Sequence, residues 1–377
     1  IRHTGASGDA VSLANDGTCT ANVTNNLSNR NVVINGEFQV AQRSTQVSNI
    51  ASASSGYHTV DRWYTTTGSA GIWTQSRDTD VPAGTPFRYS LKMDCTTADS
   101  SLAAGDRLML SYRLEGQDVQ RFGKGTTSPK KFALSFWVKS PKTGTHIVEL
   151  FDHDNSRHIC KAYTISSANT WEQQKLVFDN ETSNAFGNDN GKSFEIQFYL
   201  AAGSNYTSGT LATSWATKVD ANRAVGQVNV ADNTANNFYL CGVQLEASDV
   251  CTDFEHRSFA DELRRCQRYY FKLTGDDNDF LLSGFTYSAS LYYFIVDFPQ
   301  VMRAFPSYTG SATAARFFTD NPSQDFNLNT LTIAAQATTT YPSSMWLHAD
   351  QGGAGVASGG VLQPQNAVGT LEFSAEL

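Results

Sequence analysis

The stretch FEHRSFADELRRCQRYY, residues 254–270, divides the chain, because it is a helix-like segment in a sequence that otherwise has the pattern of β-structure. Ser258 fits a helix N-cap, and Asp261, three residues later, fits the partner of a capping box. The apolar side chains recur at the spacing of one helical face: Phe259, Leu263, Cys266 and Tyr270. The pattern predicts a short amphipathic connecting helix at 258–272.

The overall composition favours an all-β protein. Charged residues make up only 17% of the 377 residues, whereas aromatic residues reach 12%. The formal net charge of -8 argues against a nucleic-acid partner, because phosphate binding needs clustered Lys and Arg. The short basic cluster of Arg264, Arg265 and Arg268 is more typical of a solvated helix face than of a phosphate site. No apolar run approaches the roughly 18 residues of a membrane helix, so we expect no membrane insertion.

The six cysteines are expected to be free thiols that serve as small apolar residues. They lie far apart and form neither a CxxC pair nor a Cys/His spacing typical of zinc. A disulfide between Cys241 and Cys251 remains open from their separation, although no secretory signal peptide is recognisable. The sequence therefore predicts neither a metal site nor a cofactor.

Residues 29–257 have the alternating pattern of an antiparallel sandwich. Candidate strands recur between turn-rich runs, as expected for a jelly roll of two sheets. One predicted strand carries four apolar side chains on one face, which should point inward: Phe132, Leu134, Phe136 and Val138. The other strands are predicted at 31–34, 37–40, 146–151, 173–178, 194–200 and 237–245.

Shorter β segments are expected on either side of this region. Residues 1–28 contain a small hairpin around Asn15-Asp16-Gly17, and because a lone hairpin is rarely stable, it should pair with other copies or pack on the next domain. Residues 273–377 are predicted to form a second, smaller β-sandwich domain. Its expected strands lie within 280–298 and 330–333, and residues 352–360 are expected to form a glycine-rich loop.

Several motifs resemble those of tail-fibre and related adhesin proteins of tailed bacteriophages. Those around the helix are GVQLE at 242–246, FEHRS at 254–258, CQRYY at 266–270 and the FP and MR pairs within 298–306. Three others resemble a carbohydrate-binding-module type of jelly roll: NGEFQVAQR at 35–43, VDRWY at 60–64 and LSFWVK at 134–139. The resemblance implies a virion protein, made in the host bacterial cytoplasm, with a shaft-like segment at 1–28. It also implies a homotrimer that contacts other virion tail proteins.

Two polar clusters could carry chemistry. Asp152, His153 and Asp154, with His158, could hold a metal or supply a general base, but a polar hairpin turn is the commoner structure for such a stretch. The loop at 275–279 carries three carboxylates and could bind Ca²⁺, although it lacks the EF-hand spacing and fits a solvated linker better. We predict no catalytic residue.

Aromatic side chains on loops are the candidate glycan contacts, because sugar rings stack their C–H faces on Trp and Tyr. Among these candidates, Tyr341 and Trp346 are the first choice for the glycan site. They lie between residues 307 and 360, whose loops should be furthest from a shaft at the other end of the chain. Tyr206 and Trp215, on a jelly-roll loop, form the competing site. Trp73 also lies beside a turn-rich stretch, although packing is the commoner role for any one of these residues.

The function expected from the residues and the resemblance is non-enzymatic attachment of a bacteriophage to a glycan or another receptor on the bacterial surface. Weak contacts on each chain would be multiplied when a trimer engages one surface. One alternative is a virion structural or decoration protein whose jelly roll serves assembly. A second is a glycan depolymerase, which would need two carboxylates, or a nucleophile and its base, at a fixed separation.

Overall fold

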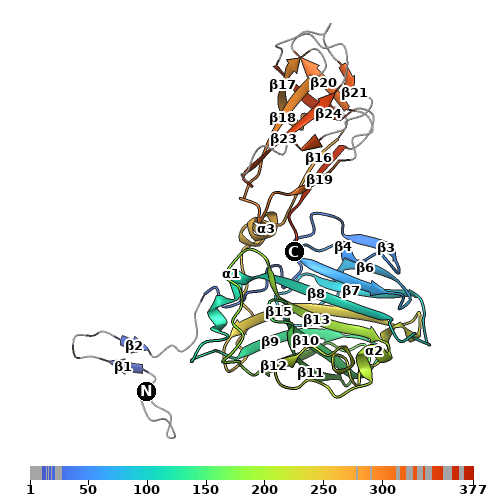
Figure 1. Ribbon diagram of the computed structural model, residues 1–377, viewed down its shortest axis with the longest axis vertical. Helices are drawn as coiled ribbons and strands as arrows, with labels where there is room; N and C mark the ends of the chain where they lie inside the picture. Colours follow the sequence, from blue (N-terminus) through green and yellow to red (C-terminus); the bar gives the residue numbers. More distant parts are fainter. Residues whose placement is uncertain are drawn as a thin grey trace.

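The computed structural model describes two β bodies joined through helix α3 (Figure 1). The described residues are 11–13, 15, 17, 19–21, 28–276, 279–288, 291–310, 315–319, 326–328, 334–335, 342–350, 359–364 and 369–377. The predicted N-terminal hairpin is present: β1 (Val11–Leu13) pairs with β2 (Cys19–Ala21), with Leu13 opposite Cys19. No helix among the described residues is long and apolar enough to cross a membrane.

The larger body is a sandwich of two antiparallel sheets, which confirms the predicted jelly roll. The seven-stranded sheet has the order β14 (Ala216–Thr217), β11 (Arg157–Ile165), β10 (Gly144–Asp152), β13 (Lys192–Ala202), β8 (Arg107–Glu115), β5 (Trp63–Gly68) and β4 (Gly56–Tyr57). The six-stranded sheet has the order β12 (Glu172–Phe178), β9 (Phe132–Lys139), β15 (Asn237–Ala247), β7 (Ser90–Thr97), β6 (Ile72–Asp78) and β3 (Gln46–Ile50).

The core of this body lies between the two sheets and follows the alternation read from the sequence. The inward face of β9 is the predicted one, and its four apolar side chains are fully buried: Phe132, Leu134, Phe136 and Val138. They meet apolar residues of the facing strands, for example Phe198 of β13, whose ring lies 5.0 Å from that of Phe136. Alternation with a period of two is therefore enough to assign the buried face here.

The strands predicted at 31–34 and 37–40 are absent, and the segment is a folded loop instead. Asn35 adopts a left-handed backbone with φ of 58°, and its amide bonds to both the N–H and the C=O of Val40, at 2.9 and 2.8 Å. Gly36 lies so close to β15 that an added Cβ would sit 2.2 Å from the Val243 carbonyl oxygen. These side-chain hydrogen bonds replace strand pairing, which the apolar alternation alone did not reveal.

Helix α3 (Phe259–Gln267) begins where the sequence predicts and ends earlier. The Ser258 hydroxyl accepts a hydrogen bond from the Asp261 amide at 3.2 Å and donates one to the Asp261 carboxylate at 2.6 Å, which confirms Ser258 as the N-cap. The helix ends at Gln267, not at 272, because the chain enters strand β16 (Tyr270–Gly275). Its buried face also differs from the prediction: Phe259 is 54% exposed, whereas Glu262 is buried in an ion pair with Arg257 at 2.9 Å.

The smaller body is the predicted second β-sandwich. Its three-stranded sheet has the order β16, β25 (Gly369–Ser374) and β19 (Ser307–Gly310). Its seven-stranded sheet has the order β21 (Phe326–Leu328), β20 (Ala315–Thr319), β24 (Gly359–Pro364), β17 (Leu282–Ser288), β18 (Leu291–Asp297), β23 (Ser344–Asp350) and β22 (Ala334–Ala335). The strand expected at 330–333 and most of the glycine-rich loop expected at 352–360 lie outside the described residues.

Arg62 joins the two bodies. It precedes β5, is 1% exposed, and forms an ion pair with Glu376, which follows β25. Its guanidinium lies 3.3 Å from the ring centre of Tyr269, just after α3, and donates to the Arg113 carbonyl oxygen at 2.7 Å. Arg43 adds a second ion pair to Glu376 at 3.2 Å. A buried cation needs such partners, so this contact couples the jelly roll, the helix and the last strand.

The substitution Glu376→Gln should lower the free energy of unfolding by about 3 to 5 kcal/mol, because it leaves Arg62 buried without its counter-charge. Urea titration followed by tryptophan fluorescence measures the loss. Glu372→Gln is the matched control, since Glu372 pairs with Lys272 at 3.3 Å and both side chains are partly exposed. That variant should lose less than about 1 kcal/mol, and equal losses in the two variants would contradict this role for Glu376.

Candidate functional site

The outer face of the seven-stranded jelly-roll sheet is closed in part by residues 203–228, here called the covering segment. Its short helix α2 (Ser204–Thr207) lies against β13 (Figure 1). The segment also adds β14 to the sheet edge and buries a satellite core with it, formed by Met109, Ile147, Cys160, Tyr199 and Ala224. A ligand therefore has no access to this part of the sheet.

Arg223 fastens the covering segment to the sheet. Its Nε and Nη2 donate to the Glu149 carboxylate at 3.0 and 2.9 Å, and Nη2 also donates to Gln197 at 2.7 Å. Burial alone would raise the pKa of Glu149, but the Arg223 charge and the hydrogen bonds from His158 and Arg223 outweigh it and lower that pKa. The carboxylate therefore stays charged, and the pair is a buried ionic anchor.

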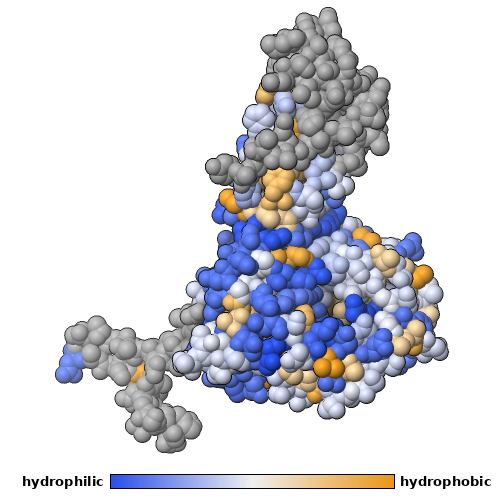
Figure 2. Space-filling view, viewed as in Figure 1, coloured by the Kyte–Doolittle hydropathy of each residue, from blue (hydrophilic) through white to orange (hydrophobic). Residues whose placement is uncertain are grey.

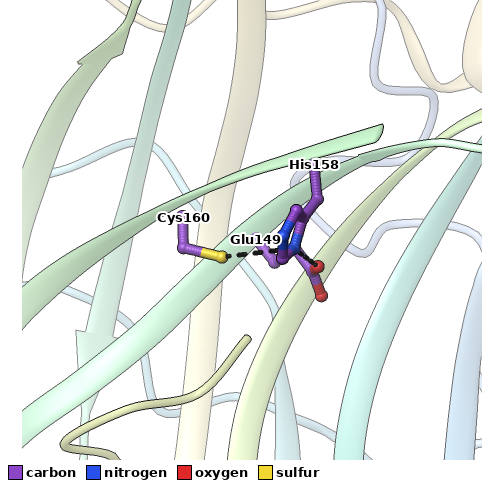
Figure 3. A group of neighbouring side chains, drawn as sticks. All are labelled: Glu149, His158 and Cys160. Atoms are coloured by element: carbon purple, nitrogen blue, oxygen red, sulfur yellow. Dashed lines mark hydrogen bonds and ion pairs between the residues drawn. The ribbon is translucent and has the colours of Figure 1, made fainter. Parts of the chain in front are cut away.

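Glu149, His158 and Cys160 also lie close enough to be considered as metal ligands, with their ligand atoms within 4.8 Å of one another (Figure 3). The Glu149 oxygens are already engaged by Arg223, by Tyr199 at 3.0 Å and by His158 at 2.7 Å. Burial and the Glu149 charge raise the pKa of the Cys160 thiol, whereas a metal ligand or nucleophile must be the thiolate. The group fits a structural role better than a chemical one.

The predicted cluster of Asp152, His153, Asp154 and His158 does not converge on one point. Residues 153–156 form the turn between β10 and β11, as the commoner interpretation predicts. Each side chain has a different partner: Lys124 for Asp152 at 2.7 Å, Glu195 for His153 at 2.7 Å, the Gly187 amide for Asp154 at 2.8 Å and Glu149 for His158. The arrangement offers no common metal or general-base site.

The other polar predictions are answered only in part. Two residues of the candidate Ca²⁺ loop, Asp277 and Asn278, lie outside the described residues, and the Asp279 carboxylate accepts a hydrogen bond from the Asp276 amide at 2.9 Å. The cysteines whose side chains the structure describes are free, as predicted, so Cys241 and Cys251 form no disulfide.

The aromatic side chains predicted on jelly-roll loops lie in packing contacts. Tyr206 stands on the satellite core, and its hydroxyl accepts a hydrogen bond from Arg107 at 2.6 Å. The Trp215 ring lies 5.7 Å from that of Phe132, and its Nε1 donates to a backbone carbonyl at 2.7 Å. Tyr206 and Trp215 thus have different partners and do not form one site. Trp73 is fully buried in β6, so it cannot serve as a loop contact.

The arginines of α3 line two adjoining cavities of about 340 and 280 Å³. Arg268 forms two hydrogen bonds of 2.8 Å with the Glu115 carboxylate, and Arg265 donates to the Asn29 side chain at 3.0 Å. Arg121, from the opposite wall, donates to the Asn29 carbonyl oxygen. These hydrogen bonds hold the loop before the jelly roll against the helix.

An aromatic surface lies on the outer face of the seven-stranded sheet in the smaller body. Phe285 of β17 pairs with Tyr293 of β18, and Ile295 of β18 pairs with Trp346 of β23. The Tyr293 ring centre lies 5.9 Å from that of Phe285 and 5.7 Å from that of Trp346. Phe285 is 36% exposed and Ile295 39% exposed. We call Phe285, Tyr293, Ile295 and Trp346 the aromatic platform. The surface of the jelly roll is mostly hydrophilic in the view of Figure 2, with scattered hydrophobic residues.

Trp346 thus lies on a strand and not on a loop as expected, and Tyr341 lies outside the described residues. Sequence reasoning missed Phe285, Tyr293 and Ile295. The available signal was the run LYYFIVD at 291–297, which is apolar on both faces of its strand. One face of this strand, formed by Tyr292, Phe294 and Val296, is buried in the core. The apolar side chains of the other face therefore point away from that core.

The substitution Arg223→Met should loosen the covering segment, because Glu149 loses its main counter-charge while it remains buried. We expect a loss of about 3 kcal/mol in stability and faster amide exchange across residues 203–228, measured by mass spectrometry. Lys218→Met is the control in the same segment, since Lys218 pairs at 3.1 Å with the exposed Asp220. Unchanged exchange in Arg223→Met would contradict the anchoring role.

No family model matches the chain, and no curated protein matches it. Similar solved structures include the enzymatically active domain of tailspike protein 4 of bacteriophage CBA120, at 16% identity and a TM-score of 0.29, where the match covers 59% of this chain and 21% of that one. A putative sugar binding protein from Bacteroides thetaiotaomicron matches at 13% identity and a TM-score of 0.30, over 58% of this chain and 100% of that one.

A third similar structure is a family 11 carbohydrate-binding module from Clostridium thermocellum in complex with a mixed-linked tetrasaccharide. It matches at 12% identity and a TM-score of 0.27, over 52% of this chain and 91% of that one. The structural neighbours of this chain thus include carbohydrate-binding modules and a phage tailspike domain, while identities and TM-scores this low decide nothing about its ligand.

Proposed function

We propose that this chain is a non-enzymatic adhesin that binds a glycan of a bacterial surface and so attaches a bacteriophage particle to its host. The aromatic platform is the observation that carries the proposal. A partly exposed Trp beside an exposed Phe offers faces on which sugar rings stack. The motifs that resemble those of tail-fibre proteins, from GVQLE at 242–246 to CQRYY at 266–270, support the virion part of the proposal.

The shape of the platform suits a polymer more than a small molecule. Its side chains stand on three neighbouring strands, each about 4.8 Å from the next, so they span roughly 10 Å of the sheet face; Phe285 and Ile295 are exposed there, whereas Tyr293 is only 9% exposed. An open surface contacts a short run of sugar residues and lets the rest of the polymer continue. Contacts of this kind are weak singly, and a homotrimer would raise their combined strength by engaging several sites at once.

One observation favours a structural role for the jelly roll itself. The covering segment and its Arg223–Glu149 anchor close part of the sheet face that could otherwise receive a ligand. The jelly roll would then serve as a scaffold for assembly, and the smaller body would meet the glycan. A glycan depolymerase remains the other alternative, and release of reducing ends from a host polysaccharide would reveal it.

The double variant Trp346→Ala with Phe285→Ala should weaken binding to host-surface polysaccharide by about tenfold or more, because two stacking faces of roughly 1 kcal/mol each are lost. Biolayer interferometry on immobilised polysaccharide measures the affinity of the full chain. The melting temperature should change little, since both side chains lie on the outer sheet face.

Two controls make this result specific. Tyr206→Ala with Trp215→Ala tests the competing jelly-roll site and should leave the affinity unchanged. Trp171→Ala removes another partly exposed tryptophan, whose Nε1 donates to Asp80 at 2.8 Å, and should also bind normally. If the jelly-roll pair alone removes binding, the platform is not the glycan site.

A further inference from the structure

A third cavity, of about 470 Å³, opens at the rim of the jelly roll beside the first turn of α3. Five side chains line it: Gln39, Arg77, Arg88, Tyr89 and Phe259. Arg77 lies in β6 and Tyr89 directly precedes β7, so the wall is the end of the sandwich, and Phe259 faces it from the helix. A volume of several hundred Å³ is the usual size of a small-molecule site.

The two aromatic residues give this cavity stacking faces. Phe259 is 54% exposed at the start of α3, although the amphipathic pattern of the helix predicts it to be buried. Tyr89 is partly exposed, and the Arg77 guanidinium lies 4.2 Å from its ring centre. Tyr89 packs in part against the hydrophobic core of the sandwich, whereas Phe259 does not belong to that core, so the exposure of Phe259 is more than packing requires.

The two arginines give the cavity a positive wall. Arg77 donates through Nη1 to the Gln39 carbonyl oxygen at 2.7 Å, which positions its guanidinium and leaves its other N–H groups for a ligand. Arg88 is exposed. Among the residues that the structure describes, neither arginine forms an ion pair with a carboxylate, and no acidic residue lines the cavity. Two neighbouring arginines without a carboxylate partner are unexpected in a chain with a net charge of -8.

Glu37, two residues before Gln39, has partners other than the arginines of the cavity. The Glu37 carboxylate accepts a hydrogen bond from the Gln39 side-chain Nε2 and lies 3.0 Å from His256 Nδ1. Because the Gln39 amide nitrogen is used in this way, its Oε1 remains as an acceptor at the cavity. The lining therefore combines a hydroxyl-binding amide oxygen, two aromatic faces and two guanidinium groups.

We propose that this cavity binds a sugar residue that carries an oxyanion, either a carboxylate or a phosphate. Phe259 and Tyr89 would stack on the sugar ring, and Arg77 and Arg88 would bind the anion with the fork geometry that guanidinium offers to such groups. The site is separate from the aromatic platform. The cavity would recognise an acidic sugar residue, and the platform would bind the uncharged ring faces of a polymer.

Calorimetric titration of the full chain with glucuronate, glucose 6-phosphate and glucose tests this assignment. At least one charged sugar should bind about tenfold more tightly than glucose, and its affinity should fall with added salt. The charged sugar that binds better identifies carboxylate or phosphate as the natural group. Arg88→Gln and Phe259→Ala should each weaken that binding about fivefold or more without unfolding the protein, because both side chains are exposed.

Arg264→Gln is the matched control, since Arg264 is an exposed arginine of the same helix that does not line this cavity. It should bind the charged sugar normally, and so should Trp346→Ala, which separates this cavity from the proposed platform. Equal affinity for glucose and both charged sugars, or charged-sugar binding that survives both Arg88→Gln and Phe259→Ala, would overturn the inference. Loss of polysaccharide binding in Trp346→Ala with Phe285→Ala would still support the platform in that case.

Discussion

The buried Arg62 guanidinium is the constraint on which the arrangement of the larger and smaller bodies depends. It comes from the jelly roll, stacks on Tyr269 just beyond the helix and pairs with Glu376 just beyond the last strand of the smaller body. Removing such a cation from water is costly, and the cost is offset only when all these partners are present. Residues far apart in the chain must therefore meet correctly before the contact is favourable.

The same principle explains why the jelly-roll sheet is closed. A second buried ion pair, between Arg223 and Glu149, holds the covering segment over an apolar patch of that sheet. Once this face is closed, the exposed aromatic side chains that remain lie elsewhere. The platform of the smaller body and the arginine-lined cavity beside α3 are two such places, and they differ in charge: the first lies on an apolar sheet face, and the second has two unpaired guanidinium groups.

The candidate sites show how much of a site can be predicted from residue type without a structure. Trp346, expected on a loop, lies partly exposed on β23, and its neighbours Phe285 and Tyr293 belong to strands that are not adjacent to it in the sequence. Likewise Asp152, His153 and His158 look like one cluster in the sequence. Alternation along the strands turns His158 toward Glu149 and away from the turn, so proximity in the chain does not become a shared site.

The sequence by itself determined the all-β class, the inward face of β9, the positions of β9, β10, β12, β13 and β15, and the capped start of α3, whereas no strand range was predicted for β3 to β8. These features follow from local periodicity and from capping chemistry within a few residues. The tertiary structure alone decided that 29–43 is a loop, that Glu262 is buried while Phe259 is exposed, and that α3 ends at Gln267. The burial of Glu262 and the end of α3 depend on partners more than 90 residues away, Asn35 for Glu262 and Ser374 for Tyr270, and no local pattern carries such information.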